Sequence, residues 1–301
     1  MSKIKSWIKA ARLRTLPLAL SSIMMGSFLA IATNTYNWRV ILLSLITTLL
    51  LQILSNLAND YGDGMKGTDN NNRLGPLRTI QSGEISPRQM KFGIGIFVAL
   101  SLISGVWLIL ESLGTNWYLG LLFLALGIAA IAAAIKYTVG NTAYGYSGFG
   151  DLFVFLFFGL LAVIGTYFLV THKVYWELIL PASSMGLFST GVLNLNNMRD
   201  MKNDANSGKH TLALMLGIKN AKLYHYTIIT AAMLFTIVYV LINYHSIWQF
   251  LFIISFPFMI KDLIDISKIS DKSLFDPYLK RLALLTLLFT VLFGSGIIIS
   301  L

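Results

Sequence analysis

Residues 38–60 of this 301-residue chain read WRVILLSLITTLLLQILSNLAND, and this stretch decides the class of fold. No charged side chain lies between Arg39 and Asp60. A bilayer core about 30 Å thick requires roughly 20 apolar residues in a helix, so the stretch predicts a membrane-spanning helix. Asp60 is therefore expected at the point where that helix leaves the apolar layer.

The composition of the whole chain agrees with this interpretation. Hydrophobic residues make up 56% of the chain, charged residues make up 12%, and the mean hydropathy is +0.71, far outside the range of soluble domains. Only helices and closed barrels satisfy their backbone groups in lipid, and the long continuous apolar runs favour an all-α bundle. We predict one transmembrane domain, 1–301, with spans near 16–33, 38–58, 92–110, 117–135, 149–170, 175–197, 223–243, 246–266 and 282–300. Pro257 should kink the eighth span.

The basic residues predict the orientation of these nine spans. With the N-terminus on the cytoplasmic side, 21 of the 23 Lys and Arg residues fall on that side, and only Arg39 and Lys173 fall outside. This is the distribution that the positive-inside rule requires. The net charge of +10 is therefore interpreted as a membrane-insertion signal, and no nucleic-acid partner is expected. The first span is too long for a signal peptide and should be retained.

Two polar segments, NLANDYGD after the second span and NLNNMRDMKND after the sixth, resemble each other. The pattern Asn56-x3-Asp60 recurs 140 positions later as Asn196-x3-Asp200. Four predicted helices separate the two patterns, so both should emerge on the same face of the membrane. This placement allows a parallel four-helix internal repeat.

Helical continuation of both spans would gather the acids of each motif on one face. Asn56, Asp60 and Asp63 are spaced i, i+4, i+7. In the second motif, Asp200 and Asp204 follow Asn196 at i+4 and i+8. Two groups of carboxylates would then face one mouth of the bundle, where their mutual repulsion favours a bound cation.

The residue types around these acids predict which cation. The chain has no cysteine and no histidine accompanies the motifs, which disfavours zinc and redox metals. Oxygen ligands suit Mg²⁺, which usually completes its coordination with substrate phosphate oxygens. Basic side chains nearby would clamp the same oxygens. These are Lys66, Arg73, Arg78, Arg199, Lys202 and Lys209. The sequence therefore predicts a magnesium and diphosphate site.

Other interpretations compete with this one at each segment. A solvated loop would also be charged, but nine of the thirteen acids lie in the two motifs and in 262–276, and the helical spacing in the motifs favours a metal site. Residues 262–276 alternate in sign and predict a solvated, self-paired surface. Asp151 is expected either to favour a helix N-terminus or to contact substrate. In 136–151, Tyr137 and Tyr144 either line a ligand cavity or belong to an interfacial aromatic belt.

The ordered set of motifs in this chain also resembles a known family. The matching segments are NLANDYGDGMKGTD at 56–69, RLGPLRTIQSGEIS at 73–86, YT and GFGDLFVFLFFG within 137–159, and NNMRDMKNDANSGKHTLALMLG at 196–217. Together with nine spans they resemble the UbiA superfamily of intramembrane prenyltransferases, and within it the enzymes that prenylate 1,4-dihydroxy-2-naphthoate. One departure is Asn141, where the family usually has proline.

The resemblance implies Mg²⁺-dependent transfer of a polyprenyl group from polyprenyl diphosphate to 1,4-dihydroxy-2-naphthoate, with loss of carbon dioxide, giving demethylmenaquinone. It implies a bacterial cytoplasmic membrane, an active site on the cytoplasmic side, and no identifiable protein partner. The expected metal ligands are Asp60, Asp63, Asp69, Asp200 and Asp204. The residues expected at the substrates are Asn56, Lys66, Arg73, Arg78, Tyr137, Tyr144, Asn196, Arg199 and Lys209. Those expected in catalysis are Asp60, Asp63, Asp200, Asp204, Arg78 and Lys209.

Three alternatives to this activity are considered. The same fold would serve another acceptor, such as homogentisate or 4-hydroxybenzoate. A cation-coupled transporter would place its acids near the bilayer midplane, whereas these acids are predicted at the cytoplasmic edge. A non-catalytic membrane scaffold is the third. The length of the prenyl chain does not follow from the sequence.

Overall fold

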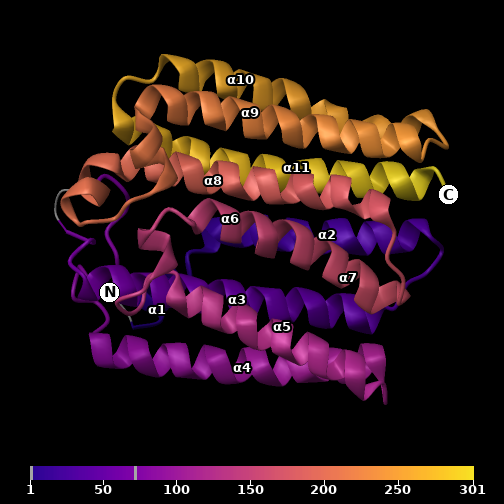
Figure 1. Ribbon diagram of the computed structural model, residues 1–301, viewed down its shortest axis with the longest axis horizontal. Coiled ribbons are helices and arrows are strands. Elements are labelled where there is room, and N and C mark those ends of the chain that lie inside the picture. The colour runs from indigo at the N-terminus through magenta and orange to yellow at the C-terminus, as the bar shows by residue number, and fades with distance from the viewer. Residues whose placement is uncertain (1–2, 71–72) are drawn as a thin grey trace.

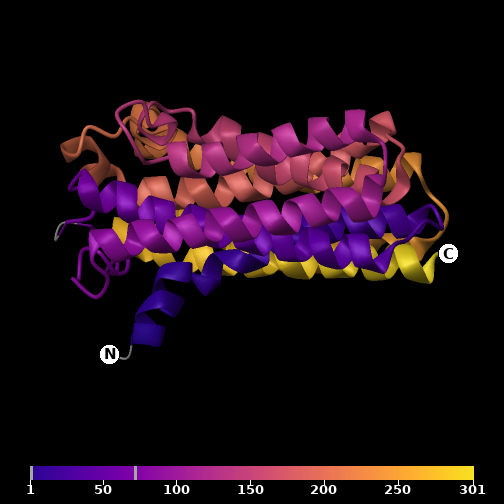
Figure 2. The same ribbon diagram turned by 90° about the horizontal axis from the view of Figure 1, so that it is seen from below.

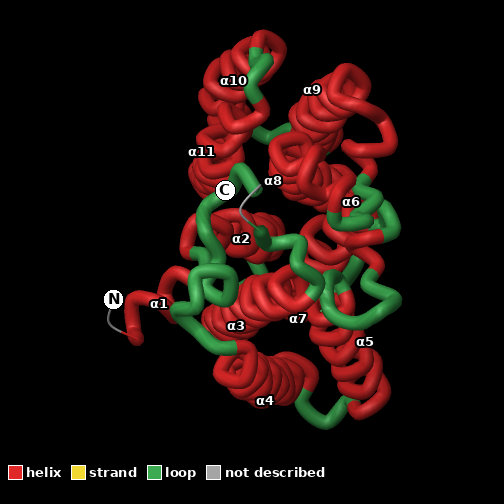
Figure 3. The backbone as a smooth tube through the Cα atoms, turned by 90° about the vertical axis from the view of Figure 1, so that its left-hand side faces the viewer, coloured by secondary structure: helices red, strands yellow, loops and turns green. Residues whose placement is uncertain are grey.

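The computed structural model describes residues 3–70 and 73–301, and this part of the chain is built from helices without a strand (Figure 1). The long helices run side by side, and the connections gather at the two ends (Figures 1 and 2). Seen end-on, α9 and α10 lie at one side of the assembly and α4 at the other (Figure 3). The α-helices are α1 Lys3–Ala11, α2 Leu16–Ala32, α3 Trp38–Met65, α4 Pro87–Leu113, α5 Trp117–Lys136, α6 Gly150–Val154, α7 Ala162–Thr171, α8 Ile179–Asn206, α9 Leu212–Ile242, α10 Phe256–Lys268 and α11 Asp276–Ile299.

The predicted all-α membrane fold is confirmed. Eight helical segments of the described residues are long and apolar enough to cross a bilayer, so the protein is a multi-pass membrane protein. The predicted eighth span is not one of these eight segments, because it consists of a 3-10 helix, η5 Ile247–Ser255, followed by α10. The change from 3-10 helix to α-helix falls directly before Pro257, which has no backbone N–H to donate to a regular helix. The internal repeat stays a prediction.

Two helices extend beyond their predicted ends, and this extension positions the motif acids. α3 was expected to end near residue 58 and continues to Met65, while α8 was expected to end near 197 and continues to Asn206. Asp60, Asp63, Asp200 and Asp204 therefore lie on the last turns of helices, as their spacing predicts, whereas Asp69 lies beyond the end of α3. Both helices end at the same end of the bundle (Figure 1).

The fifth span contains an irregularity that the sequence did not predict. Between α6 and α7 lies a π-helical segment, η3 Phe155–Leu161. Gly159 in this segment lies so close to α8 that a Cβ there would be 2.7 Å from the Ala182 carbonyl oxygen and 2.8 Å from the Gly186 Cα. Glycine on both helices therefore permits the close packing of their backbones. π-helical turns of this kind are frequent next to functional sites.

A short helix before the first span was also not predicted. α1 diverges from the bundle in Figure 2, and two side chains on it contact the bundle closely. The Lys9 ammonium forms a 2.5 Å ion pair with Glu84, and the Trp7 ring covers Gly93 of α4, where a Cβ would be 2.6 Å from the ring. These contacts hold the segment that follows, with its two arginines, against the end of α3.

Candidate active site

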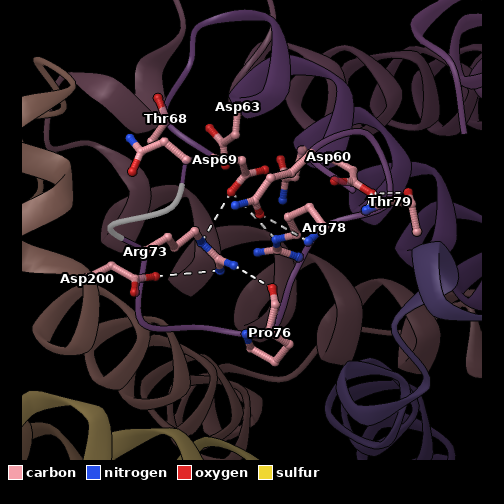
Figure 4. Close-up of polar contacts among 12 residues, drawn as sticks. Asp60, Asp63, Thr68, Asp69, Arg73, Pro76, Arg78, Thr79 and Asp200 are labelled. Atoms are coloured by element: carbon pink, nitrogen blue, oxygen red, sulfur yellow. Dashed lines mark hydrogen bonds and ion pairs between the residues drawn. The ribbon is translucent and has the colours of Figure 1, made fainter. Parts of the chain in front are cut away.

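Asp60 of the first motif is buried, with 1% of its surface exposed. Its Oδ2 accepts hydrogen bonds from the Thr79 backbone N–H at 3.2 Å and from the Thr79 hydroxyl at 2.5 Å (Figure 4). Its Oδ1 is buried and accepts no hydrogen bond from the described residues. A buried carboxylate oxygen without a partner is rare and indicates a water or an ion. Thr79, between α3 and α4, therefore lies over α3 and fixes one oxygen of Asp60, while the other accepts no hydrogen bond from the described residues.

Asp63 lies one turn further along α3 and is held by a tyrosine. The Tyr146 hydroxyl donates to Asp63 Oδ1 at 2.8 Å and lies 2.6 Å from the Thr68 hydroxyl. The ammonium groups of Lys66 and Lys209 lie 3.8 Å and 5.3 Å from the centre of the Tyr146 ring. Tyr146 was not among the predicted site residues, although it belongs to the tyrosine-rich segment that the sequence singled out.

Asp69 is enclosed by arginines. Its Oδ1 is 3.2 Å from Arg73 Nε and 3.8 Å from Arg78 Nε (Figure 4). Burial raises the pKa of the Asp69 carboxyl above its ordinary value, while Arg78 and Arg73 act in the opposite direction. Arg73 also reaches Asp200, with 3.6 Å between Nη2 and Oδ2, so it bridges the two motifs. The sequence correctly placed these acids near bases.

The second motif has its own internal arginine. Arg199 is fully buried, and its guanidinium donates to both oxygens of Asp200, from Nε to Oδ1 at 2.9 Å and from Nη2 to Oδ2 at 2.5 Å. Nη2 also donates to Asn196 Oδ1 at 2.8 Å, and Nη1 pairs with Asp276. Arg14 lies 3.4 Å from the same Asp276 carboxylate.

The prediction that 262–276 is a solvated, self-paired surface is therefore wrong for Asp262 and Asp276, while Lys261, Lys268 and Asp271 are exposed as predicted. Asp276 begins α11 beside the second motif, and Asp262 is buried and pairs with Arg281. The pairing partners of Asp276 come from 77 and 262 positions away in the sequence, which no local charge pattern reveals.

Asp204 and Lys209 close the second motif. Burial lowers the pKa of the Lys209 ammonium, but the carboxylates of Asp63 and Asp204 outweigh this effect, so the pKa lies above its ordinary value. Lys209 is thus a buried cation that stays charged at neutral pH. The Asn203 side chain donates to the Thr68 carbonyl at 2.7 Å, which joins the second motif directly to the loop after the first.

These residues surround the polar end of a cavity of about 420 Å³. Of the predicted residues, those that line it are Asn56, Asp63, Arg78, Tyr137, Tyr144, Asn196 and Lys209. The others, Asp60, Lys66, Asp69, Arg73, Arg199, Asp200 and Asp204, lie behind or beside this wall and do not line it. Asn56 has a structural contact as well, because its amide donates to the Ala11 carbonyl at 2.9 Å and to the Thr15 hydroxyl at 3.0 Å.

Two arginines in the lining were missed as site residues. Arg12 and Arg14 precede α2, and the sequence argument counted them only as charges that orient the chain. The Nη2 of Arg12 and the Nε of Arg78 are buried and make no hydrogen bond within the described residues. Burial lowers the pKa of the Arg78 guanidinium well below its ordinary value, and the like charges of Arg12 and Arg73 add to this effect. The polar end of the cavity thus presents guanidinium donors without a hydrogen-bond partner among the described residues.

Beyond the charged end, the cavity becomes aromatic and then aliphatic. Tyr137 and Tyr144 meet edge to face at 5.3 Å, Tyr144 stacks on Phe153 at 4.1 Å, and Phe157 follows at 6.1 Å, all along the cavity wall. Deeper lining residues come from α3, α4, α5 and α7. Tyr137 and Tyr144 therefore line the cavity, which decides between the two interpretations of their segment.

The acids do not form a finished metal cage. Within residues 3–70 and 73–301, no three Asp, Glu or His side chains gather closely enough to hold an ion by themselves. Mg²⁺ does not require such a cage, because one or two carboxylates with water and substrate phosphates usually bind it. The free Oδ1 of Asp60 and the all-oxygen donor set fit this kind of site. The residues present are therefore compatible with Mg²⁺ bound together with an anionic substrate.

Fold and site together define a multi-pass helical membrane protein built to receive an amphiphile with an anionic head and an apolar tail. The family described as UbiA prenyltransferase matches residues 19–287, and the chain belongs to this family. It is accordingly a prenyltransferase.

Individual proteins agree with this assignment. The 1,4-dihydroxy-2-naphthoate octaprenyltransferase of Haemophilus influenzae is 43% identical over 99% of this chain and 97% of its own length. An apo UbiA homolog from Aeropyrum pernix K1 has the same fold, with a TM-score of 0.67, 16% identity and coverage of 96% of this chain and 98% of its own. A UbiA homolog from Archaeoglobus fulgidus, solved with DMAPP and Mg²⁺, gives a TM-score of 0.58 at 16% identity and covers 97% of this chain and 100% of its own.

Proposed function

We propose that this protein transfers a polyprenyl group from polyprenyl diphosphate to 1,4-dihydroxy-2-naphthoate, with loss of carbon dioxide, to give demethylmenaquinone. The observation that carries the proposal is the cavity itself. Buried guanidinium donors of Arg12 and Arg78 without hydrogen-bond partners lie at one end, and an aromatic and aliphatic wall continues from them. The name of the Haemophilus influenzae relative supports the choice of acceptor.

The diphosphate head belongs at the charged end. Arg78 and Lys209 line the cavity there and would bind phosphate oxygens through charge-assisted hydrogen bonds, with Arg12 beside them. Asp60, Asp63, Asp200 and Asp204 would hold Mg²⁺, with Asp69 the fifth proposed ligand. Bound Mg²⁺ supplies neutralisation of the charge that develops on the leaving diphosphate.

Asp69 has a second role in this proposal. Its carboxylate already faces Arg73 and Arg78, so it orients two cations toward the phosphates as well as contributing an oxygen. Arg73 and Arg199, which do not line the cavity, would act by holding Asp69 and Asp200 in place. Lys66 is exposed and would contribute mainly to the field at the entrance.

The allylic carbon of the donor would lie next to the aromatic wall. The faces of Tyr137, Tyr144 and Phe153 can stabilise positive charge that develops as the carbon to oxygen bond lengthens. The same apolar wall excludes water, which would otherwise trap the prenyl group as an alcohol. The acceptor carries a carboxylate, and the cavity-lining Arg14 and the amide of Asn196 are available to orient it.

The charged end is proposed to face the cytoplasm. The basic residues concentrate at this end of the bundle, as the positive-inside rule predicts for the cytoplasmic side of a bacterial inner membrane. Four of the acids lie on the last turns of α3 and α8, and Asp69 lies just beyond α3, so none is at mid-helix, which disfavours the coupling-ion site of a transporter.

An acceptor panel tests the proposal. Purified protein is incubated with labelled polyprenyl diphosphate and with 1,4-dihydroxy-2-naphthoate, homogentisate or 4-hydroxybenzoate, each with Mg²⁺ and with EDTA. We expect a decarboxylated prenyl product with 1,4-dihydroxy-2-naphthoate only, and none in EDTA until Mg²⁺ is restored. Product with 4-hydroxybenzoate alone would overturn the acceptor assignment, and full activity in EDTA would overturn the role of the metal.

A further inference from the structure

Three glycines in the deep wall of the cavity have no packing role. Gly105 of α4, Gly127 of α5 and Gly165 of α7 all line the cavity. A Cβ at Gly127 would meet nothing within 4 Å, and at Gly105 and Gly165 the nearest atoms would be 3.9 Å away. By contrast, a Cβ at Gly159 would be within 3 Å of the backbone of a neighbouring helix. The three cavity glycines therefore leave open space where a side chain would fit.

That space is not required by the helices. Glycine in a helix interior costs about 1 kcal/mol relative to alanine, and here no close helix contact offsets the cost. What the three glycines share is that each keeps the cavity wide at its own position.

Contacts between neighbouring helices give the order of the three positions. The Gly105 Cβ position lies 3.9 Å from Thr47 of α3, which is thirteen residues before Asp60 and so about 20 Å from it along the helix. The Gly120 position in α5 lies 3.6 Å from Ile109 of α4. Because α5 runs back toward the charged end, Gly127 lies about one helical turn nearer that end than Gly105.

The third position lies deepest. The Ser112 hydroxyl at the end of α4 donates to the Leu169 carbonyl of α7 at 2.5 Å, so these residues are level. Gly165 lies one turn before Leu169, whereas Gly105 lies about two turns before Ser112. Gly165 is therefore about one turn deeper in the cavity than Gly105. The order away from the phosphate end is Gly127, Gly105, Gly165.

We infer that these three glycines set the length of the prenyl tail that the enzyme accepts, because the tail passes over them in this order on its way toward the bilayer. This inference rests on the proposed function. It predicts that a side chain at each position blocks tails that extend beyond it and spares shorter ones. Gly127→Leu should exclude every tail long enough to reach the deep wall. Gly165→Leu should exclude only the longest tails.

The test measures kcat/KM with geranyl, farnesyl, geranylgeranyl and octaprenyl diphosphate for the three Leu variants. Leucine favours helix and meets no atom at Cβ, so the helices should fold. We expect Gly127→Leu to lower kcat/KM for octaprenyl diphosphate at least tenfold while staying within about threefold of wild type for geranyl diphosphate, which also reports correct folding. The cutoff should move to longer tails with Gly105→Leu and again with Gly165→Leu.

Gly95→Leu is the matched control. Gly95 lies on α4 like Gly105, also has nothing within 4 Å of its Cβ position, but is exposed and does not line the cavity. Its tail-length profile should equal that of the wild type. Unchanged profiles in the three cavity variants, or equal loss with every diphosphate, would overturn the inference. An inactive wild type would instead overturn the proposed function.

Discussion

The two acidic motifs look alike in sequence but are neutralised differently in the structure. In the first motif, Asp60 receives two hydrogen bonds from Thr79 and Asp63 receives one from Tyr146, all from uncharged donors. Among the described residues neither acid forms an ion pair. In the second motif, Asp200 is paired through both oxygens with Arg199. Asp60 and Asp63 therefore keep carboxylate charge that no ion pair compensates among the described residues, whereas Asp200 is already paired.

An acid next to a substrate diphosphate has to be held in place, and its charge has to stay available to a metal ion. Hydroxyl and amide donors fix a carboxylate and leave its charge available to a metal ion. A guanidinium fixes it more rigidly, but competes with the metal for the same oxygens. The sharing of Arg199 with Asp276 lowers that competition, because part of the positive charge of Arg199 is matched elsewhere.

The largest expected effects come from removing one acid of each motif. Asp60→Ala and Asp200→Ala should each lower kcat about 100-fold or more, because about 3 kcal/mol of charge stabilisation at the leaving group is lost. Asp200→Ala should also destabilise the protein more than Asp60→Ala does, by roughly 3 kcal/mol, since it removes one partner of the buried Arg199. Activity assays and thermal unfolding in detergent measure the two effects.

Equal melting temperatures of Asp60→Ala and Asp200→Ala would contradict the inferred difference in how the two acids are neutralised. Full activity in either variant would contradict the participation of both motifs in one site. Asp60→Asn and Asp200→Asn, which keep the shape of the side chain, serve as matched variants for the charge alone.

The difference between the motifs was only partly visible in the sequence. The spacing of Asn56, Asp60 and Asp63 predicts a shared helix face, and α3 does continue far enough to carry it. Hydropathy alone located all eight helical segments of the described residues that are long and apolar enough to cross a bilayer, because burial in lipid requires long apolar runs. The neighbouring Arg73 and Arg78 were predicted near the acids because they follow them closely in the chain.

The site contacts that the sequence did not predict join segments that are distant along the chain. Asp276 reaches Arg199 because α11 begins beside the end of α8, and Tyr146 reaches Asp63 because a loop folds over α3. Neither contact has a local signature. Arg12 and Arg14 carried a signal, their charge, but the positive-inside rule explained it so well that no site role was considered.

Asp276→Asn tests whether the sharing of Arg199 matters. We expect the concentration of Mg²⁺ at half-maximal velocity to rise about 10-fold, with a smaller effect on kcat, since a residue that orients a metal ligand typically contributes this much to affinity. Asp271→Asn, five residues earlier, is the control, because Asp271 is exposed and its side chain contacts Ser273 and not Arg199. An equal shift in both variants would mean that loop charge and not Arg199 is responsible.

Tyr146→Phe tests the hydrogen bond from an uncharged donor that holds Asp63 in the first motif. It removes the hydroxyl that donates to Asp63 and keeps the ring on which Lys66 and Lys209 rest. A hydrogen bond to a charged group contributes about 1.5 kcal/mol, so kcat/KM should fall about 10-fold. Tyr146→Leu removes the ring as well and should lower it further. If the Phe and Leu variants are equally active, the ring has no role at the site.

The smallest expected effect separates the two lysines that share this ring. Lys66 comes from the loop after the first motif and is exposed, whereas Lys209 follows the second motif, is 6% exposed and lines the cavity. An exposed cation over an aromatic ring contributes about 0.5 to 1 kcal/mol, so Lys66→Met should raise the KM for polyprenyl diphosphate only about two- to fivefold. The rise should shrink with added salt, because exposed charges are screened. Lys209→Met should cost considerably more and depend less on salt, and equal salt dependence in the two variants would contradict the distinction between them.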